Sequence, residues 1–272
     1  MRAGIALIAR PPADWQRESG LRWLTDTGTV VEQLGFAGIW VTDSFGRGRQ
    51  TLDPTVSLSA LHAGTSRIEL GTGVLQVPLR RPGELAHRIQ SLNVLLAGRL
   101  RLGVGAGSTR ADFQIAGADY DKRFTTFDES LEVMRALWRG ERVNNSSLLA
   151  WPGTEGGPPV FLGAWRSAKT IERAAREFDG WIASGLHSTW QDLETGMQTF
   201  RAHGGKRAIV TNVPTDAGAS SSSHAATISL ACTPAEARER LQRIAAIGFD
   251  DVLLLCSDRS EHHLNSVRAL IP

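Results

Sequence analysis

Short apolar runs rich in Ile, Val and Leu recur along the chain, and amphipathic segments separate them. Parallel strands covered by helices produce this alternation, because both faces of each strand are hidden from water. Eight such runs favour a closed (β/α)8 TIM barrel over an open doubly wound sheet. The predicted strands are Gly4–Ala9, Gly38–Thr42, Ile68–Val77, Leu100–Gly105, Pro159–Ala164, Gly180–Ser184, Ala208–Val213 and Asp251–Cys256.

The segments between the runs carry the apolar stripe expected of helices that pack on a sheet. After the third run, Leu85, Ile89, Leu92 and Leu96 recur at steps of four, three and four residues. This spacing places them on one face of a helix. No linker divides the chain, so residues 1–272 are predicted to form one α/β domain. The carboxyl ends of the strands would form its working face.

Three segments depart from this pattern. Thr109–Thr126 is predicted to be a long polar loop, and Arg142–Pro158 is rich in turn residues. Long loops in a compact domain are usually lids or binding loops. The low-complexity run Asp216–Ser223 follows the seventh predicted strand and is expected to be mobile.

Composition mainly excludes classes of function. The chain has 30 Lys and Arg against 28 Asp and Glu, interspersed, which predicts no binding to nucleic acid or to an anionic membrane. No apolar run approaches the ~20 residues that span a bilayer, and the N-terminus reads as a first strand, not a secretion signal. Cys232 and Cys256 are too few for a disulfide framework or a thiolate metal site, so a cytoplasmic setting without metal is expected.

Glycine-rich backbone is the first candidate for chemistry. No lysine stands at the carboxyl end of a predicted strand, and neither a Walker loop nor a G-x-S-x-G elbow is present. The third strand ends in Gly71–Val74 and the fourth in Gly103–Gly107. A flat ligand could lie against such bare backbone, although glycine at a strand end can also simply relieve crowding.

The turn Gly163–Ser167 is the second candidate, because the fifth strand passes there directly into a helix. Free backbone N–H groups at the helix start, with Arg166 and the Ser167 hydroxyl, suit a phosphate. An ordinary serine N-cap beside an exposed arginine gives the same pattern. Spacing alone leaves both readings open.

Several longer stretches resemble the luciferase-like monooxygenase family. They are LGTGVLQVPLRRP, LLAGRLRLGVGAG and ADFQIAGADYDKRFTTFDESLEVM, with LGFAGIWVTDSF at the second strand and REFDGWIASG at the sixth. The resemblance runs from Ile5 to about Ser184 and more loosely to the end. It implies a barrel that binds FMN or, in a sister branch, a deazaflavin coenzyme, with the ring at the carboxyl ends of the strands.

Carried over residue by residue, the resemblance implies a bulge in the third strand, with a cis peptide bond at Gly73–Val74 behind the ring. It implies a phosphate site at the fifth-strand turn, reached by Arg123, and an acidic residue at Asp43. The cofactor-binding residues expected in this way are Asp43, Thr72, Gly73, Val74, Gly105, Gly107, Arg123, Trp165, Arg166, Ser167 and Ser184.

One position departs from the family pattern. Where the family often has a catalytic histidine, this chain has Ser44, which cannot replace a base that works near neutral pH. His187 after the sixth strand and Tyr120 in the long loop are candidates to supply the proton. No catalytic residue is assigned from the sequence.

The resemblance therefore implies a flavin-dependent oxidoreductase: reduced FMN from a separate reductase would react with O₂ and oxygenate a small organic substrate. A deazaflavin coenzyme acting as a hydride carrier is the alternative, kept open by Arg47, Arg49, Arg80 and Arg81. A flavin-binding protein without turnover is a third reading, supported by the missing histidine. The resemblance also implies a homodimer that packs through helices near the second and third strands.

Overall fold

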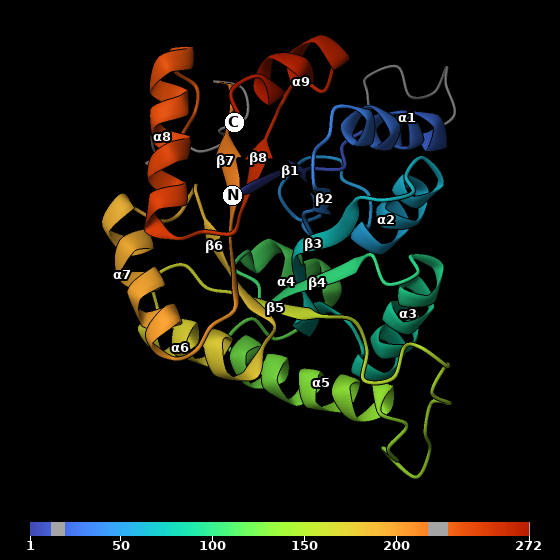
Figure 1. Ribbon diagram of the computed structural model, residues 1–272. Coiled ribbons are helices and arrows are strands. Elements are labelled where there is room, and N and C mark those ends of the chain that lie inside the picture. The colour runs from blue at the N-terminus through green and yellow to red at the C-terminus, as the bar shows by residue number, and fades with distance from the viewer. Residues whose placement is uncertain (12–19, 217–227, 272) are drawn as a thin grey trace.

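The computed structural model describes residues 1–11, 20–216 and 228–271, which form a closed barrel of eight parallel strands in sequential order. Figure 1 shows the helices around the strands. The predicted single TIM barrel is confirmed. Its strands are β1 (Arg2–Leu7), β2 (Gly38–Val41), β3 (Glu69–Gln76), β4 (Leu100–Gly105), β5 (Val160–Gly163), β6 (Gly180–Ser184), β7 (Arg207–Pro214) and β8 (Asp251–Leu255). Its helices are α1 (Gly20–Gln33), α2 (Pro54–Ala63), α3 (Pro82–Leu95), α4 (Arg110–Ala116), α5 (Arg123–Trp138), α6 (Ala168–Glu177), α7 (Trp190–Ala202), α8 (Pro234–Ile247) and α9 (Glu261–Arg268), with a 3-10 turn η1 (Val77–Leu79).

Local chemistry fixes where several helices begin. Asp53 caps α2 by accepting hydrogen bonds from the Thr55 and Val56 amides, and Pro54 follows it at the first helical position. Thr189 and Thr233 form capping boxes at α7 and α8. The helices that these caps start pack on the outside of the barrel and form its outer core. The predicted stripe of α3 is part of the same core.

The inside of the barrel is filled by its own side chains. Trp40 and Phe161 meet edge to face there, with ring centroids 5.6 Å apart, and Ile182, Ile209 and Leu253 pack beside them. The barrel is therefore not a pore, and a ligand can be held only above this layer, at the carboxyl ends of the strands.

An ion-pair network closes the amino ends of the strands. Glu69 pairs with Arg207 at 2.6 Å and with Arg101 at 3.0 Å, while Asp251 pairs with Arg207 and Arg2, both at 2.8 Å. Burial alone would raise the pKa of Glu69, but the hydrogen bond from Arg207 and the charges of the three arginines outweigh it and lower the pKa. The network therefore stabilises the end of the barrel opposite the working face.

The segment predicted as a polar loop at Thr109–Thr126 is not all loop. It contains the two-turn helix α4, and α5 already starts at Arg123. Phe113 of α4 is buried, and the Asp112 carboxylate accepts hydrogen bonds from the amides of Phe45 and Gly46. Tertiary contacts therefore order a helix too short to show a periodic stripe.

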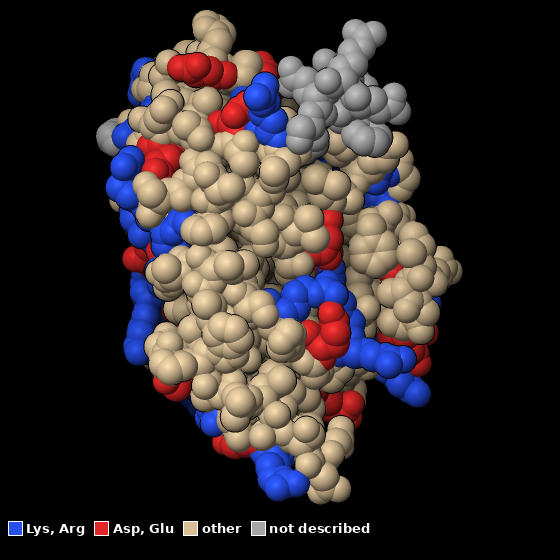
Figure 2. All heavy atoms as spheres, turned by 90° about the vertical axis from the view of Figure 1, so that its right-hand side faces the viewer, with Lys and Arg blue, Asp and Glu red and all other residues tan. Residues whose placement is uncertain are grey.

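Figure 2 views the molecule from the side of α1, α2 and α3, where a broad area is uncharged and charged groups of both signs are scattered around it. Val56 of α2 is 62% exposed and Leu95 of α3 is 56% exposed. The expected homodimer through this region stays a prediction. No helix among the described residues is long and apolar enough to cross a membrane, and those residues contain no cluster of potential metal ligands. Residues 217–223 of the run predicted to be mobile lie outside the described residues.

Candidate functional site

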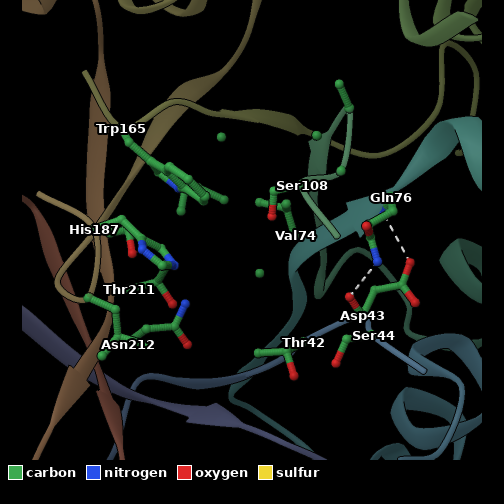
Figure 3. A pocket seen from close by; sticks show the side chains of 18 of the residues that line it. Thr42, Asp43, Ser44, Val74, Gln76, Ser108, Trp165, His187, Thr211 and Asn212 are labelled. Carbon is green, nitrogen blue, oxygen red and sulfur yellow. Dashed lines mark hydrogen bonds between the residues drawn. The ribbon is translucent and has the colours of Figure 1, made fainter. Parts of the chain in front are cut away.

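A cavity of about 790 Å³ opens at the carboxyl ends of the strands. All eight strands, or the segments that follow them, contribute to its lining. Figure 3 shows Trp165, His187, Thr211 and Asn212 on one side and Val74 and Gln76 on the other. This volume lies in the range of sites for cofactors and drug-sized ligands.

The β3 wall of the cavity is bare and apolar. The register of β3 against β4 shifts between Thr72 and Leu75, and the Gly73–Val74 peptide bond is cis, so the predicted bulge and cis bond are both confirmed. A Cβ atom on Gly105 would lie 2.8 Å from a Val74 methyl group, and one on Gly163 would lie 3.0 Å away. Glycine on β4 and β5 therefore keeps the space around Val74 open for a flat ligand.

Other glycines at these strand ends have a different role. A Cβ on Gly71 would lie 2.7 Å from the Trp40 ring, and one on Gly103 would lie 2.6 Å from Ile182. Glycine at these two positions leaves space for the Trp40 and Ile182 side chains inside the barrel, so Gly71 and Gly103 relieve crowding and do not shape the cavity. Gly107 does line the cavity, with a positive φ of 83° beside the Gln76 side chain.

The structure brings ten of the eleven sequence-predicted residues to the cavity lining. Thr72 is the exception: its hydroxyl donates a 2.7 Å hydrogen bond to the Gly103 carbonyl, away from the cavity. The alternation of strand residues explains this, because Thr72 follows the inward-facing Gly71.

Asp43 lines the cavity, but its carboxylate is occupied. It pairs with the Arg80 guanidinium at nitrogen–oxygen distances of 2.6 and 3.1 Å and accepts a 2.9 Å hydrogen bond from the backbone N–H group of Gln76. Arg80 also pairs with Asp53 at 3.1 Å, so it is not available to an anionic ligand as the sequence reading suggested. Asp43 therefore fixes the end of β3 to β2.

Gln76 is a lining residue that sequence reasoning missed. Its side-chain N–H group donates to the Asp43 carbonyl at 2.8 Å and to the Asp112 carboxylate at 2.9 Å, which leaves its carbonyl oxygen Oε1 without a partner. Figure 3 shows the hydrogen bonds that join Gln76 to Asp43. Only the fold brings these three residues together, so the sequence held no signal for the arrangement.

Strand β7 supplies a second wall that the sequence did not predict. Its register against β8 shifts between Val210 and Val213, and Asn212 adopts a left-handed φ of 55° in this bulge. Thr211 and Asn212 both line the cavity as a result. The polar pair Thr211 and Asn212 within the predicted strand Ala208–Val213 was the available signal.

Four buried polar atoms of the lining have no hydrogen-bond partner among the described residues: Gln76 Oε1, Arg123 Nε, Ser184 Oγ and Thr211 Oγ1. Ser184 and Thr211 are direct register partners on β6 and β7. Buried polar groups are normally hydrogen-bonded, so a group of unpartnered ones in one cavity indicates a site completed by a ligand.

At the fifth-strand turn, the two readings of the sequence coexist. The Ser167 hydroxyl caps α6 by accepting from the Thr170 amide at 3.2 Å, as an ordinary N-cap does. Arg166 donates to the His187 carbonyl at 3.1 Å and lies 3.3 Å from Asp192, yet it is still exposed to the cavity. The first-turn N–H groups of α6 and this guanidinium remain suited to an anion.

Arg123 and Tyr120 form the edge of the cavity nearest α5. The Arg123 guanidinium stacks over the rings of Tyr120 and Phe124 at 4.1 and 4.3 Å and donates to the Tyr120 carbonyl at 2.9 Å. The Tyr120 hydroxyl donates to the Ser108 carbonyl at 3.3 Å. Arg123 is therefore held in place with its Nε still free for a ligand.

His187 differs from Tyr120 in having a free polar atom. Its ring stacks on Trp165, with centroids 4.1 Å apart, and neither ring nitrogen has a hydrogen-bond partner in the described part of the chain. Burial lowers the pKa of His187 below its ordinary value of 6.5, and the charges of Arg47 and Arg166 lower it further. Near neutral pH the imidazole is therefore uncharged and can accept a proton.

A barrel with a glycine-lined slot, a bulged third strand and a fifth-strand turn suited to an anion is the type of site that the sequence resemblance implied. The family described as luciferase-like monooxygenase matches residues 1–267. The chain belongs to this family.

Related proteins carry several different names. The chain is 31% identical over 185 residues to a 5,10-methylenetetrahydromethanopterin reductase of Methanolobus tindarius, covering 66% of this chain and 54% of that protein. It is 31% identical over 184 residues to an F420-dependent glucose-6-phosphate dehydrogenase of Nocardia farcinica, covering 61% and 54%. The chain thus spans about half the length of these curated relatives. Monooxygenase RslO1 from Streptomyces bottropensis has the same fold, with a TM-score of 0.82, 20% identity, and 99% and 97% of the two chains covered.

Proposed function

We propose that this protein is an oxidoreductase that binds a flavin-type coenzyme in the cavity at the carboxyl ends of its strands. The observation that carries this proposal is the set of unpartnered buried polar atoms around a glycine-lined slot. A tricyclic ring with polar edges and apolar faces fits both features. When bound, the coenzyme would supply two-electron chemistry, and the protein would supply binding, orientation and exclusion of water.

Different lining residues would bind the ring, its polar edge and the phosphate of the coenzyme. Val74 would lie against the ring, and the Ser184 and Thr211 hydroxyls with the Gln76 carbonyl would meet its polar edge. Arg166 and the amino end of α6 would hold the phosphate, with Arg123 reaching from α5. The other expected contacts, at Gly105, Gly107 and Trp165, line the same space.

Of the two possible carriers, we propose the deazaflavin coenzyme, which transfers hydride without O₂. Arg47 and Arg49 line the cavity, and neither has an acidic partner in the described part of the chain, so they are free for an anionic tail. The relative from Nocardia farcinica is named as F420-dependent, after such a coenzyme. The FMN reading, with a separate reductase and an oxygenated substrate, is the second candidate because the matching family is described by monooxygenation.

Direct titration tests the proposal. The purified protein should bind either the deazaflavin coenzyme or FMN. Quenching of tryptophan fluorescence should report the binding, because Trp165 lines the cavity. Tighter binding of FMN, with O₂ uptake on its reduction, would favour the second candidate. Binding of neither would overturn both, and tight binding without turnover on any substrate would favour a carrier protein.

Arg166→Ala tests the phosphate site. Loss of a charged hydrogen bond at this exposed position should weaken binding of the phosphorylated coenzyme, whether deazaflavin coenzyme or FMN, by roughly tenfold, and should leave riboflavin, which lacks the phosphate, nearly unaffected. Arg176→Ala is the matched control, because Arg176 lies on the same helix but pairs with Glu172 outside the cavity. Equal losses for the phosphorylated coenzyme and riboflavin in Arg166→Ala would place the phosphate elsewhere.

A further inference from the structure

In residues 1–11, 20–216 and 228–271, seven titratable side chains line the cavity, and six of them are unsuited to accept a proton near neutral pH. Four are arginines, which stay charged. The Asp43 carboxylate is paired with Arg80, and the Tyr120 hydroxyl donates to the Ser108 carbonyl. His187 remains, with both ring nitrogens unpartnered in the described chain. Among the described residues, His187 is therefore the one lining group that could act as a base at neutral pH.

The packing around His187 holds its ring in one place. Trp165 covers one face at a centroid distance of 4.1 Å and an interplanar angle of 28°. The His187 backbone carbonyl accepts a hydrogen bond from Arg166, and the next residue, Ser188, is fully buried. A catalytic base needs a fixed position, because its nitrogen must stand within hydrogen-bond distance of the reacting proton.

A polar amide lies on the same side of the cavity. Asn212 reaches it because of the β7 bulge, and its side chain has no hydrogen-bond partner among the described residues. Figure 3 shows His187 and Asn212 on one side of the cavity, opposite Val74 and the rest of β3. A ring placed against Val74 would therefore have these two side chains on the substrate side.

We propose that His187 is the catalytic base of this oxidoreductase and that Asn212 binds the oxygen of an alcohol substrate. This inference rests on the proposed hydride-transfer function. The substrate C–H bond breaks with its electron pair, which leaves as hydride for the oxidised deazaflavin coenzyme. The O–H bond breaks as well, its proton goes to the free nitrogen of His187, and a carbonyl C=O bond forms. The histidine then returns the proton to solvent.

The sequence resemblance implied a base at the position of Ser44, directly after β2. Ser44 and His187 line the same cavity, and the imidazole of His187 enters it from the segment after β6. In the described part of the chain, two charged groups act on the His187 ring: Arg47, from the segment after β2, and Arg166, from the β5–α6 turn. Asp192 at the start of α7 pairs with Arg166 and partly neutralises its charge. Both arginines favour the neutral, proton-accepting form.

The first test measures the histidine itself, without coenzyme. In ¹⁵N-histidine-labelled protein, the ring signals of His187, assigned by their loss in His187→Gln, should titrate below pH 6.5. His87→Gln is the matched control for assignment, because His87 is exposed on α3 outside the cavity. Arg47→Gln should raise the pKa of His187, whereas Arg49→Gln, in the same segment, should leave it in place. A His187 that titrates above pH 6.5, or that ignores Arg47→Gln, would overturn the proposed electrostatics of the base.

The second test measures turnover of coenzyme-loaded protein on isopropanol, cyclohexanol and glucose 6-phosphate. For any alcohol that the wild type oxidises, kcat/KM should fall on the acid side, at or above the pKa found by NMR, because the bound coenzyme's phosphate and tail would partly neutralise Arg166 and Arg47. His187→Gln should lower kcat by roughly 10²–10⁴-fold and remove that acid limb, with unchanged coenzyme affinity. Asn212→Ala should act mainly on KM.

The outcomes separate this inference from the function on which it rests. If His187→Gln keeps wild-type kcat and its acid limb, the base lies elsewhere while hydride transfer stands. If the wild type binds the coenzyme but oxidises none of the alcohols, hydride transfer from an alcohol is wrong and the role of His187 falls with it.

Discussion

Thr211 gives a test of the site in which stability and binding should change in opposite directions. Its hydroxyl is buried in the cavity wall and has no hydrogen-bond partner among the described residues, and Thr211 is only 4% exposed. Burying a hydroxyl without a partner costs about 1–3 kcal/mol in proteins. Thr211→Val keeps the shape of the side chain and removes this cost, so the unliganded protein should become more stable by about 1 kcal/mol, or roughly 2–4 °C in Tm.

The coenzyme should respond to the same change with weaker binding. If the hydroxyl meets the ring, its loss removes one hydrogen bond worth about 0.5–1.5 kcal/mol, which is roughly a two- to tenfold higher Kd. Thr72→Val is the matched control on β3. The Thr72 hydroxyl is satisfied by the Gly103 carbonyl outside the cavity, so its removal should destabilise the fold by about 1 kcal/mol and leave the Kd unchanged.

Two measurements decide the case: urea unfolding of the unliganded proteins, and coenzyme titration followed by tryptophan fluorescence. The expected pattern is a stabilised, weakly binding Thr211→Val beside a destabilised, normally binding Thr72→Val. If Thr211→Val destabilises the fold, its hydroxyl is already satisfied. If it is stabilised but binds the coenzyme normally, Thr211 does not face the ligand, and the assignment of the β7 wall to the coenzyme is wrong.

Two further predictions concern the closed end of the barrel and the slot. Glu69→Gln should lose about 2–3 kcal/mol at pH 7, since partly exposed arginines make the loss smaller than for a fully buried pair. The pKa of Glu69 is lowered in the folded protein, so the wild type has this stability at neutral pH and loses it as the pH falls through the folded pKa. Urea unfolding should therefore show a smaller difference in unfolding free energy between the wild type and Glu69→Gln at pH 4 than at pH 7. Gly105→Ala would place a methyl group 2.8 Å from Val74 and should weaken coenzyme binding at least about tenfold. Gly83→Ala, whose added carbon meets only ordinary contacts, should leave titrations unchanged.

The sequence predicted the framework well because burial leaves a direct trace in composition. A strand covered on both sides must be apolar throughout, so each of the eight strands was visible as a run. The strand-to-helix turn at Gly163–Ser167 was visible for a related reason, since the helix start needs a cap. The cis bond at Gly73–Val74 came from the family resemblance and not from the residues alone.

Features set by tertiary contacts could not be predicted. Asp112 and Phe113 order the short helix α4 because the segment after β2 and the end of β3 supply partners for the Asp112 carboxylate. Arg80 looked like a free cation until the fold placed Asp43 and Asp53 against it. In each case the deciding partner lies more than 25 residues away in the chain, and no local pattern records it.

The two bulges show why the lining itself was harder to predict than the strands. Strict alternation along β3 from Gly71 would turn Gly73, Leu75 and Val77 inward. The bulge instead turns Gly73 and Val74 to the cavity together, and Leu75 packs in the outer core.

The bulge in β7, where its register against β8 shifts, changes the lining in the same way. Alternation from Ile209 through Thr211 would place Val213 in the cavity, but the bulge brings in Asn212 and sends Val213 to the outer core. On β7 the bulge thus exchanges the apolar Val213 for the polar Asn212, and on β3 it exchanges Leu75 for the smaller Val74 and leaves Gln76 facing inward in place of Val77. The bulges are therefore what turn an apolar barrel mouth into a site with hydrogen-bonding groups, and a reading based on a period of two necessarily assigns the wrong face beyond each of them.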